Sequence, residues 1–247
     1  MNSLDQHEKY LKKNVFFTKS KWPHFNLLFK DINILKKKKI DNILSLERGG
    51  LYGSISIFKP YFTKKNFTSI DCSSYKIKKR GAYNKKYVLS DKIIKKKIDY
   101  FKNYKKLGLK KNFYDLIIIP NLLHHIFDIK KLLDQCYISL KKGGELYIFE
   151  PTVREIHQIP DDYFRFTPYG LKELLKKSKF KKITYKFSGG PFSASLYCLD
   201  QAAQFLPRKK SEEFKKKLIS GNFKNFLNME SKFKINRFRK HTVFPMS

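Results

Sequence analysis

The sequence predicts an α/β protein with a Rossmann-like, doubly wound, mostly parallel sheet and extra C-terminal helices. Short apolar strands alternate with amphipathic helices along most of the chain, which is typical of parallel sheets. The run Tyr114–Pro120 is almost continuously apolar, as expected of a strand buried on both faces. Two further strands each end in a carboxylate, Glu47 and Asp71. A length of 247 residues suits one large α/β domain or two small ones.

The first half of the chain is expected to contain two helices and three strands around a glycine-rich turn. Pro suits the first turn of a helix, and a short apolar run that ends in a polar residue is typical of a buried strand. In chain order we expect a helix after Pro23, a strand over Asn42–Glu47, glycines at Gly49, Gly50 and Gly53, a helix over Ser54–Phe58, and strands over Phe67–Asp71 and Ile98–Lys102.

The second half shows the clearest helix signal. Asp128 can cap a helix whose apolar residues follow helical spacing from Ile129 to Leu140, and we expect Gly143-Gly144 to end that helix. The remaining expected elements are a strand over Glu145–Phe149, a helix over Pro168–Lys177, a strand over Lys181–Phe187, helices over Phe192–Phe205 and Ser211–Lys234, and an edge strand over Thr242–Phe244.

This element order predicts three segments. Residues 1–40 form a helical N-terminal extension, residues 41–189 form the α/β core, and residues 190–247 form a helical C-terminal elaboration with a final edge strand. A long loop follows the fifth strand, and long loops in compact domains are often functional lids.

The composition is strongly basic, with a formal net charge of +33. Such a charge favours nucleic acid or an anionic surface as a partner. Only seven of the 54 basic residues are arginine, however, and Lys, Ile, Asn, Phe and Tyr all have AT-rich codons. A dedicated nucleic-acid binder usually relies on arginine. We therefore expect no specific nucleic-acid partner.

The cellular setting follows from the cysteines and the hydropathy. The three cysteines, Cys72, Cys136 and Cys198, are too few for a disulfide scaffold, and no pair has CxxC spacing. No apolar run reaches 18 residues, so we expect no membrane span. The N-terminus lacks the apolar stretch of a signal peptide, so we expect a cytoplasmic protein.

The turn after the first strand is the first candidate site. Its glycines allow close approach of a ligand, and a helix N-terminus would add positive potential. Asp71, which ends the next strand, occupies the position that usually binds the ribose hydroxyls of an adenosine ligand. The alternative is an ordinary tight turn. The patterns GxGxxG, GxSxG and GxxxxGK[ST] are absent, which argues against dehydrogenase, hydrolase and nucleotide-triphosphatase functions.

Three segments carry a family resemblance. Ile43-Leu-Ser-Leu-Glu-Arg-Gly-Gly-Leu-Tyr-Gly53 resembles the first motif of the class I S-adenosylmethionine-dependent methyltransferases, with Leu51 in place of the middle glycine. Tyr114-Asp-Leu-Ile-Ile-Ile-Pro-Asn-Leu-Leu-His-His-Ile126 is similar to the family's fourth motif, and Leu140-Lys-Lys-Gly-Gly-Glu-Leu-Tyr-Ile148 to its LKPGGxLxI segment. The resemblance covers about residues 41–187 and includes methyltransferase type 11-like members.

The resemblance implies that the cofactor is S-adenosyl-L-methionine and that a methyl group is transferred to an O or N atom of a small molecule, with sugars and cell-surface glycan precursors among the acceptors. Glu47 would lie near the methionine end of the cofactor, and Asp71 would accept from its ribose. The full set of implied cofactor-binding residues is Glu47, Gly49, Gly50, Gly53, Asp71, Asn103 and Asn121.

The acceptor side offers few candidates for a general base. His124 and His125 follow the end of the buried strand, and His157 and Asp161 lie in the long loop after the fifth strand. Structural histidines and a plain surface loop are the alternatives. The same loop supplies the candidate acceptor contacts Asp162, Tyr163 and Arg165. No metal is expected, since adjacent histidines should point apart.

Two other functions remain open. The net charge favours an RNA methyltransferase, although the chain has no NPPY-like tetrad. The leucine at position 51 favours a noncatalytic S-adenosylmethionine-binding protein of the same fold. The acceptor, the methylated atom and the oligomeric state do not follow from the sequence.

Overall fold

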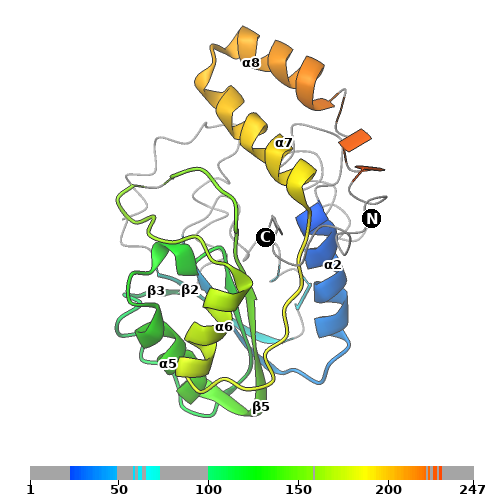
Figure 1. The fold of residues 1–247 in the computed structure, drawn as a ribbon. Helices are drawn as coiled ribbons and strands as arrows, with labels where there is room; N and C mark the ends of the chain where they lie inside the picture. Colours follow the sequence, from blue (N-terminus) through cyan, green and yellow to red (C-terminus); the bar gives the residue numbers. More distant parts are fainter. Residues whose placement is uncertain are drawn as a thin grey trace. The chain divides into compact units, whose positions relative to one another are not determined.

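Five parallel strands form the central sheet of the computed structural model (Figure 1). The structure describes residues 23–48, 58, 61–62, 65–72, 100–157, 159–220, 222, 225–226 and 228–229. The strands lie in the order β3-β2-β1-β4-β5, and each neighbouring pair runs parallel. Their bounds are β1 Asn42–Glu47, β2 Asn66–Asp71, β3 Tyr100–Phe101, β4 Tyr114–Pro120 and β5 Leu140–Phe149. The predicted parallel α/β sheet is confirmed.

The strand register brings the carboxyl ends of β1 and β2 together. Every residue of β1 pairs with one of β2, from Asn42 opposite Asn66 to Glu47 opposite Asp71. The predicted third strand is present as two residues, Tyr100–Phe101, which continue the sheet beyond β2. The two strand-end carboxylates are therefore neighbours at the edge where parallel sheets bind ligands.

Two helices pack against the sheet, and both begin where the sequence predicts. Helix α5, Ile129–Ser139, is capped by Asp128, whose Oδ1 accepts from the Lys131 amide at 3.2 Å. Helix α6, Pro168–Lys177, is capped by the Thr167 hydroxyl, which accepts from the Gly170 amide at 3.1 Å. These side chains satisfy amides that a helix start leaves without partners.

The main core lies between the sheet and these helices. It combines apolar side chains of β1, β2 and β4 with the buried face of α5 and with Leu175 of α6. Leu116, Ile117, Ile118 and Ile119 of β4 are fully buried, which explains why that strand has no alternating polar positions.

The remaining described helices flank this core in the chain. Helix α2 starts at Pro23, as predicted. The two predicted C-terminal helices are separated at Leu206-Pro207, and the second begins at Arg208, three residues before its predicted start. Their bounds are α2 Pro23–Lys36, α7 Pro191–Ala202, η4 Ala203–Phe205, α8 Arg208–Phe214 and η5 Lys215–Ser220, with η3 Leu123–His125 following β4.

The prediction that Gly143-Gly144 ends the helix of residues 129–140 is wrong. Helix α5 ends at Ser139, and β5 begins at the next residue. Both glycines lie within β5, where its pairing with β4 shifts register. Gly143 has φ +81°, and a Cβ on Gly144 would lie 3.0 Å from the Tyr114 carbonyl oxygen. The glycines are needed for this irregular strand, since a side chain would strain or obstruct it.

The predicted strand over Lys181–Phe187 is also wrong. The described backbone has no strand there and only a single bridge at Ser188. Lys182 has φ +53°, a left-handed conformation that interrupts an extended chain. Most side chains of the segment are exposed, so its Ile-Tyr-Phe pattern does not correspond to a buried strand face.

Some predictions concern residues outside the described part of the chain. These are the glycines Gly49, Gly50 and Gly53, most of the helix over Ser54–Phe58, the end of the helix predicted to reach Lys234, and the edge strand over Thr242–Phe244. Phe58 is described, and it is helical and buried.

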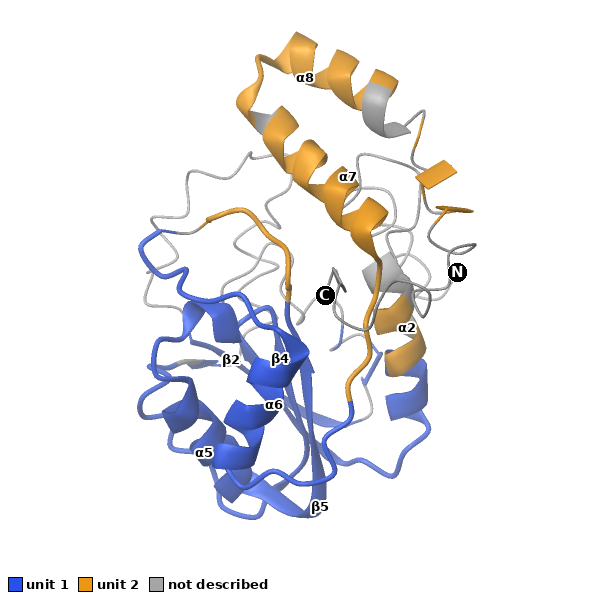
Figure 2. Cartoon of the chain, viewed as in Figure 1, with its two compact units in different colours: residues 1–7, 32–150, 158–184 blue, residues 8–31, 151–157, 185–247 orange. Residues whose placement is uncertain are grey.

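The chain divides into two compact units (Figure 2). Unit 1 comprises residues 1–7, 32–150 and 158–184 and contains the sheet. Unit 2 comprises residues 8–31, 151–157 and 185–247 and contains α7 and α8. Within the described ranges, no helix has the length and apolar character needed to cross a membrane.

Candidate functional site

Two buried carboxylates lie side by side at the carboxyl ends of β1 and β2. Glu47 and Asp71 are opposite one another in the register, and both are almost completely buried. Glu47 Oε1 accepts from the Ser45 hydroxyl at 2.6 Å, and its backbone oxygen accepts from the Cys72 amide at 2.6 Å. Buried carboxylates need donors. Because carboxylates accept hydrogen bonds and pair with cations, a pair of this kind suits a ligand with hydroxyl or ammonium groups.

Asn121 turns the chain away from the sheet at the end of β4. It adopts φ +50°, a conformation that asparagine tolerates better than most residues. Its amide donates to the Phe149 carbonyl oxygen at 2.7 Å, which joins the ends of β4 and β5. The chain then enters η3, which carries His124 and His125. Asn121 thus lies at the predicted sheet edge, directly after the last residue of β4.

Glu150 organises this turn, and the sequence analysis did not identify it. Its Oε1 accepts from the amides of Leu122 and Leu123, both at 2.7 Å. Its Oε2 lies 2.6 Å from Nδ1 of His124. Its position in the sequence could have identified Glu150, because this carboxylate directly follows a strand, and Glu47 and Asp71 are the last residues of their strands.

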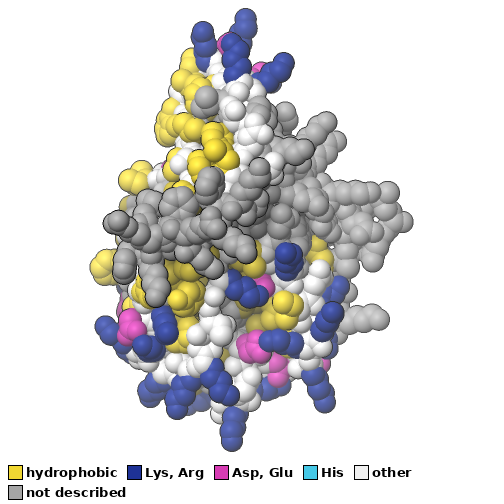
Figure 3. All heavy atoms as spheres, turned by 45° about the vertical axis from the view of Figure 1, so that its right-hand side comes forward, with side chains coloured by type: hydrophobic (Ala, Val, Ile, Leu, Met, Phe, Trp, Pro, Cys, Tyr) yellow, Lys and Arg dark blue, Asp and Glu magenta, His cyan; other side chains and the backbone are white. Residues whose placement is uncertain are grey.

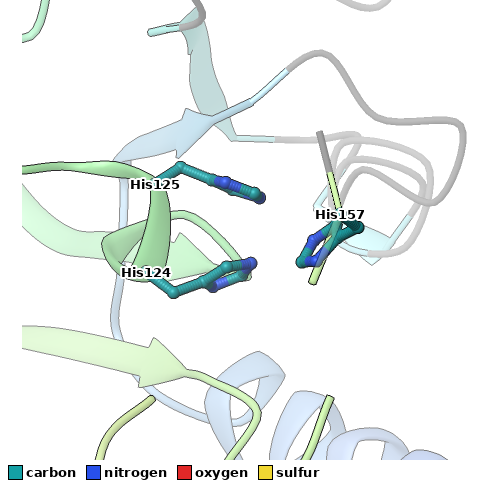
Figure 4. A group of neighbouring side chains, drawn as sticks. All are labelled: His124, His125 and His157. Atoms are coloured by element: carbon teal, nitrogen blue, oxygen red, sulfur yellow. The ribbon is translucent and has the colours of Figure 1, made fainter. Parts of the chain in front are cut away.

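The rings of His124 and His125 lie close together and are tilted relative to one another (Figure 4). Their ring centroids are 3.9 Å apart with an interplanar angle of 44°. The expectation that these adjacent histidines point apart is therefore wrong. The physical reason is that each Nδ1 finds a separate partner, Glu150 for His124 and the Asp161 carbonyl oxygen for His125. Both rings consequently project in the same direction from η3.

The loop over residues 159–166 is tied to the same strand ends. The backbone oxygen of His124 accepts from the Tyr163 amide at 2.8 Å. Asp161 Oδ2 accepts from Nη2 of Arg48 at 3.1 Å, and its backbone oxygen accepts from Nη1 at 3.2 Å. Arg48 directly follows β1. The loop is therefore held to both β1 and η3.

The predicted acceptor contacts in this loop are engaged with each other. Arg165 donates to both carboxylate oxygens of Asp162, at 2.7 and 2.9 Å. The Tyr163 hydroxyl donates to Asp161 Oδ1 at 2.9 Å, and this hydrogen bond raises the pKa of the phenol. The Tyr163 side chain is nevertheless well exposed. Its ring lies edge-on to the exposed Phe127, with centroids 5.5 Å apart.

Asn103 and His157 have local hydrogen-bond partners of their own. Asn103 is exposed after β3, where its Oδ1 accepts from the Lys105 amide at 2.9 Å. His157 is buried in unit 2, with Nδ1 3.0 Å from the Glu155 carbonyl oxygen. Their roles at the cofactor and at the acceptor stay predictions.

Sequence comparison finds that part of this chain is similar to a methyltransferase domain. Residues 50–148 match the family described as "Methyltransferase domain". A probable polyketide synthase 10 of Dictyostelium discoideum is 41% identical over 61 residues. That match covers 25% of this chain and 2% of the much longer relative.

Structure comparison finds the same fold in proteins of low sequence identity. Phosphoethanolamine N-methyltransferase 2 of Haemonchus contortus, solved with S-adenosyl-L-methionine, has a TM-score of 0.51 and 15% identity, covering 93% of this chain and 52% of that protein. A structure of that enzyme with phosphomonomethylethanolamine and S-adenosylhomocysteine matches with the same TM-score. A putative methyltransferase of Bacillus halodurans has a TM-score of 0.50 and 14% identity, covering 88% of this chain and 93% of that protein. These likenesses establish the fold.

Proposed function

We propose that this chain, which has the class I methyltransferase fold and a methyltransferase domain over residues 50–148, transfers a methyl group from S-adenosylmethionine to an O or N atom of a small molecule. The observation that carries the proposal is the pair of buried carboxylates, Glu47 and Asp71, at adjacent strand ends. A sheet of this topology binds its ligand at that edge.

The residues at this edge fit the cofactor. Asp71 would accept hydrogen bonds from the ribose hydroxyls, and Glu47 would face the methionine ammonium. Asn121 would lie under the methionine end, at the junction of β4 and β5. When bound, the cofactor would supply a methyl group already activated by its sulfonium charge. The protein then has to position the acceptor and take up its proton.

The histidine pair supports the uptake of the acceptor's proton. His124 and His125 lie in η3, which directly follows β4, and β4 is the strand next to β1. Imidazole is the side chain best suited to accept a proton near neutral pH. The exposed rings of Tyr163 and Phe127 would offer an apolar contact to the acceptor. Such a base is needed when the acceptor group is a sugar hydroxyl or an amine.

Replacing Asp71 tests the cofactor assignment. Loss of a charged hydrogen bond costs about 1.5–3 kcal/mol, so Asp71→Ala should weaken binding of S-adenosylhomocysteine about tenfold or more. Isothermal titration calorimetry measures this affinity directly. Circular dichroism would report whether the variant keeps its fold.

Asp41 provides the matched control. It precedes β1 at the opposite edge of the sheet, where its side chain pairs with Lys65 at 3.0 Å. Asp41→Ala should leave cofactor affinity unchanged. Equal affinity of the Asp71→Ala variant and the wild type would refute the role of Asp71. A wild-type protein that binds no S-adenosylhomocysteine would refute the proposed function.

The net charge of +33 favours a second candidate, methylation of RNA. This function would use the same cofactor edge and differ only in the acceptor. Its distinguishing property is a nucleic-acid complex that survives physiological salt, because specific complexes retain contacts beyond phosphate charge.

A further inference from the structure

The sheet edge opposite the candidate site is rich in lysine. At this edge, which we call the amino edge, the parallel strands begin and helices α2, α5 and α6 end. Lysine occupies every position of residues 36–39, 110–111 and 141–142, and five of the seven positions in residues 176–182. All of these segments belong to unit 1. They come from different parts of the sequence, so the fold is what brings their charges together.

Contacts within unit 1 place these segments side by side. The Asn112 amide donates to the Ile138 carbonyl oxygen at 3.1 Å, which joins the segment before β4 to the last turn of α5. The ring of Phe180 lies edge-on to that of Tyr137 on the same turn, with centroids 5.5 Å apart. Figure 1 shows the ends of α5 and α6 and the start of β5 together at the lower end of the sheet.

The lysines of the amino edge exceed the carboxylates that lie among them. Four carboxylates each pair with one lysine, at 3.0, 2.7, 2.6 and 2.7 Å: Asp41 with Lys65, Asp115 with Lys141, Glu145 with Lys38, and Glu173 with Lys176. The lysines of residues 36–39, 110–111, 141–142 and 176–182 far outnumber these four. On the face drawn in Figure 3, Lys and Arg side chains project from this lower end. The amino edge therefore carries a net positive charge.

Exposed apolar side chains lie among these lysines. Ile34 in the last turn of α2 and Ile138 in the last turn of α5 are each 50% exposed. The Ile34 carbonyl oxygen accepts from the Lys37 amide at 3.1 Å, so this side chain is next to the lysines of residues 36–39. Burial of such a side chain in an apolar medium is favourable, and the long stem of lysine lets its ammonium stay at a polar surface beside it.

We propose that the amino edge of unit 1 binds the surface of an anionic lipid membrane. Clustered lysines are attracted to acidic lipid headgroups, and apolar side chains beside them enter the boundary between headgroups and acyl chains. A lipid surface needs charge rather than the paired hydrogen bonds of arginine, which suits a lysine-rich edge. The candidate cofactor site is at the other ends of the strands, so membrane binding through this edge leaves that site open. The proposal goes beyond methyl transfer and does not depend on it.

Co-sedimentation with lipid vesicles tests the proposal. The vesicles consist of phosphatidylcholine alone or with about 30% phosphatidylserine, which supplies the negative charge. We expect the wild type to bind the vesicles with phosphatidylserine and not those without it. A wild type that binds neither kind, or binds both equally, would overturn the proposal whether or not any variant folds.

A triple variant removes charge from the amino edge alone. Lys111, Lys142 and Lys177 are exposed and come from three different segments of this edge. One lysine near an anionic membrane contributes about fivefold to the binding constant, so replacing all three by glutamate should weaken vesicle binding by at least about a hundredfold. Circular dichroism would show that the variant keeps its fold.

The matched control makes the same change of charge at the opposite edge. Lys105 and Lys106 follow β3, Lys131 lies in the first turn of α5, and all three are exposed. Their replacement by glutamate should leave vesicle affinity within about fivefold of the wild type, because these positions face away from the proposed surface. Equal weakening in the two triple variants would overturn the proposal, since the binding would then depend only on net charge.

The two isoleucines separate a membrane from a nucleic acid. The double variant Ile34→Ser, Ile138→Ser should bind the anionic vesicles roughly tenfold more weakly, because less apolar surface enters the lipid. Its affinity for poly(U) should equal that of the wild type, since isoleucine offers nothing to a phosphate backbone. Wild-type vesicle affinity in the double variant would overturn the membrane assignment and favour RNA as the partner of this edge.

Discussion

Arg48 is the residue that connects the end of β1 to the loop over residues 159–166. Its side chain is 4% exposed, and it makes two hydrogen bonds to Asp161, one to the carboxylate and one to the backbone oxygen. The sequence marks Asp161 as a candidate base. In the structure its carboxylate is shared between Arg48 and the Tyr163 hydroxyl, which favours an anchoring role for it.

We predict that Asp161→Ala destabilises the protein by about 3 kcal/mol, because it leaves a buried guanidinium without its carboxylate. Urea unfolding followed by circular dichroism measures this change. The control is Glu212→Ala, which removes the exposed ion pair with Arg208 on α8 and should cost less than about 0.5 kcal/mol. Equal losses of stability in the two variants would contradict the anchoring role.

At the scale of the elements, Asp115 joins three strands at the sheet edge opposite the candidate site. Its Oδ2 accepts from the amides of Asp41 and Asn42 at the start of β1, at 3.1 and 2.8 Å. Its Oδ1 accepts from Nζ of Lys141 on β5 at 2.7 Å. Burial alone would raise the pKa of Asp115, but the Lys141 ammonium and the two amides outweigh it and lower that pKa.

We predict that Asp115→Ala lowers the free energy of unfolding by about 1–3 kcal/mol at neutral pH, because two amides lose their acceptor. The pKa of Asp115 is lower in the folded state than its unfolded value of about 3.9, so the ionised carboxylate stabilises the fold above that pH. This contribution disappears as the pH falls through the folded pKa. Urea unfolding at several pH values should show that the difference in unfolding free energy between the wild type and Asp115→Ala becomes smaller below about pH 4. A difference that grows on acidification would contradict this assignment.

At the scale of the whole molecule, the net positive charge is large, and among the described residues it is dispersed over several elements. On the face drawn in Figure 3, the described lysine and arginine side chains are interspersed with acidic and hydrophobic ones. Several lysines are already paired with carboxylates, as Lys130 is with Asp134 and Lys176 with Glu173. Helix α8 likewise contains both signs, in the sequence RKKSEEF. A dispersed charge of this kind favours general attraction to polyanions.

We predict that binding to a single-stranded RNA such as poly(U) weakens steeply between about 50 and 200 mM salt, because neutralised phosphates release counterions. Fluorescence anisotropy at several salt concentrations measures how the affinity for RNA depends on salt. Heparin should show a parallel loss, since it offers charge without bases. An RNA complex that survives 200 mM salt and discriminates among sequences would reverse this prediction and favour the RNA methyltransferase candidate.

The elements that the sequence predicts well are those with strong local signals. The cap Asp128, the helix-starting Pro168 and the apolar run of β4 act within a few residues of themselves, so the starts of α5 and α6 and the bounds of β4 follow from them. The predictions that were wrong concern segments whose structure depends on residues far away in the sequence. Lys181–Phe187 has a suitable pattern but pairs with no strand among the described residues, and Gly143-Gly144 is explained only by the pairing of β5 with β4.

The sequence by itself determined the parallel α/β class and the two carboxylates, Glu47 and Asp71, because a strand end is recognisable from its own residues. Only the tertiary structure decided that Glu150 contacts His124, 26 residues earlier in the chain, and that the ring of His124 lies close to that of His125. The pairing of β4 with β5 creates that contact, and the direction of each ring depends on an acceptor that a neighbouring element supplies. Side-chain orientation is a property of the assembled sheet edge, which no local pattern contains.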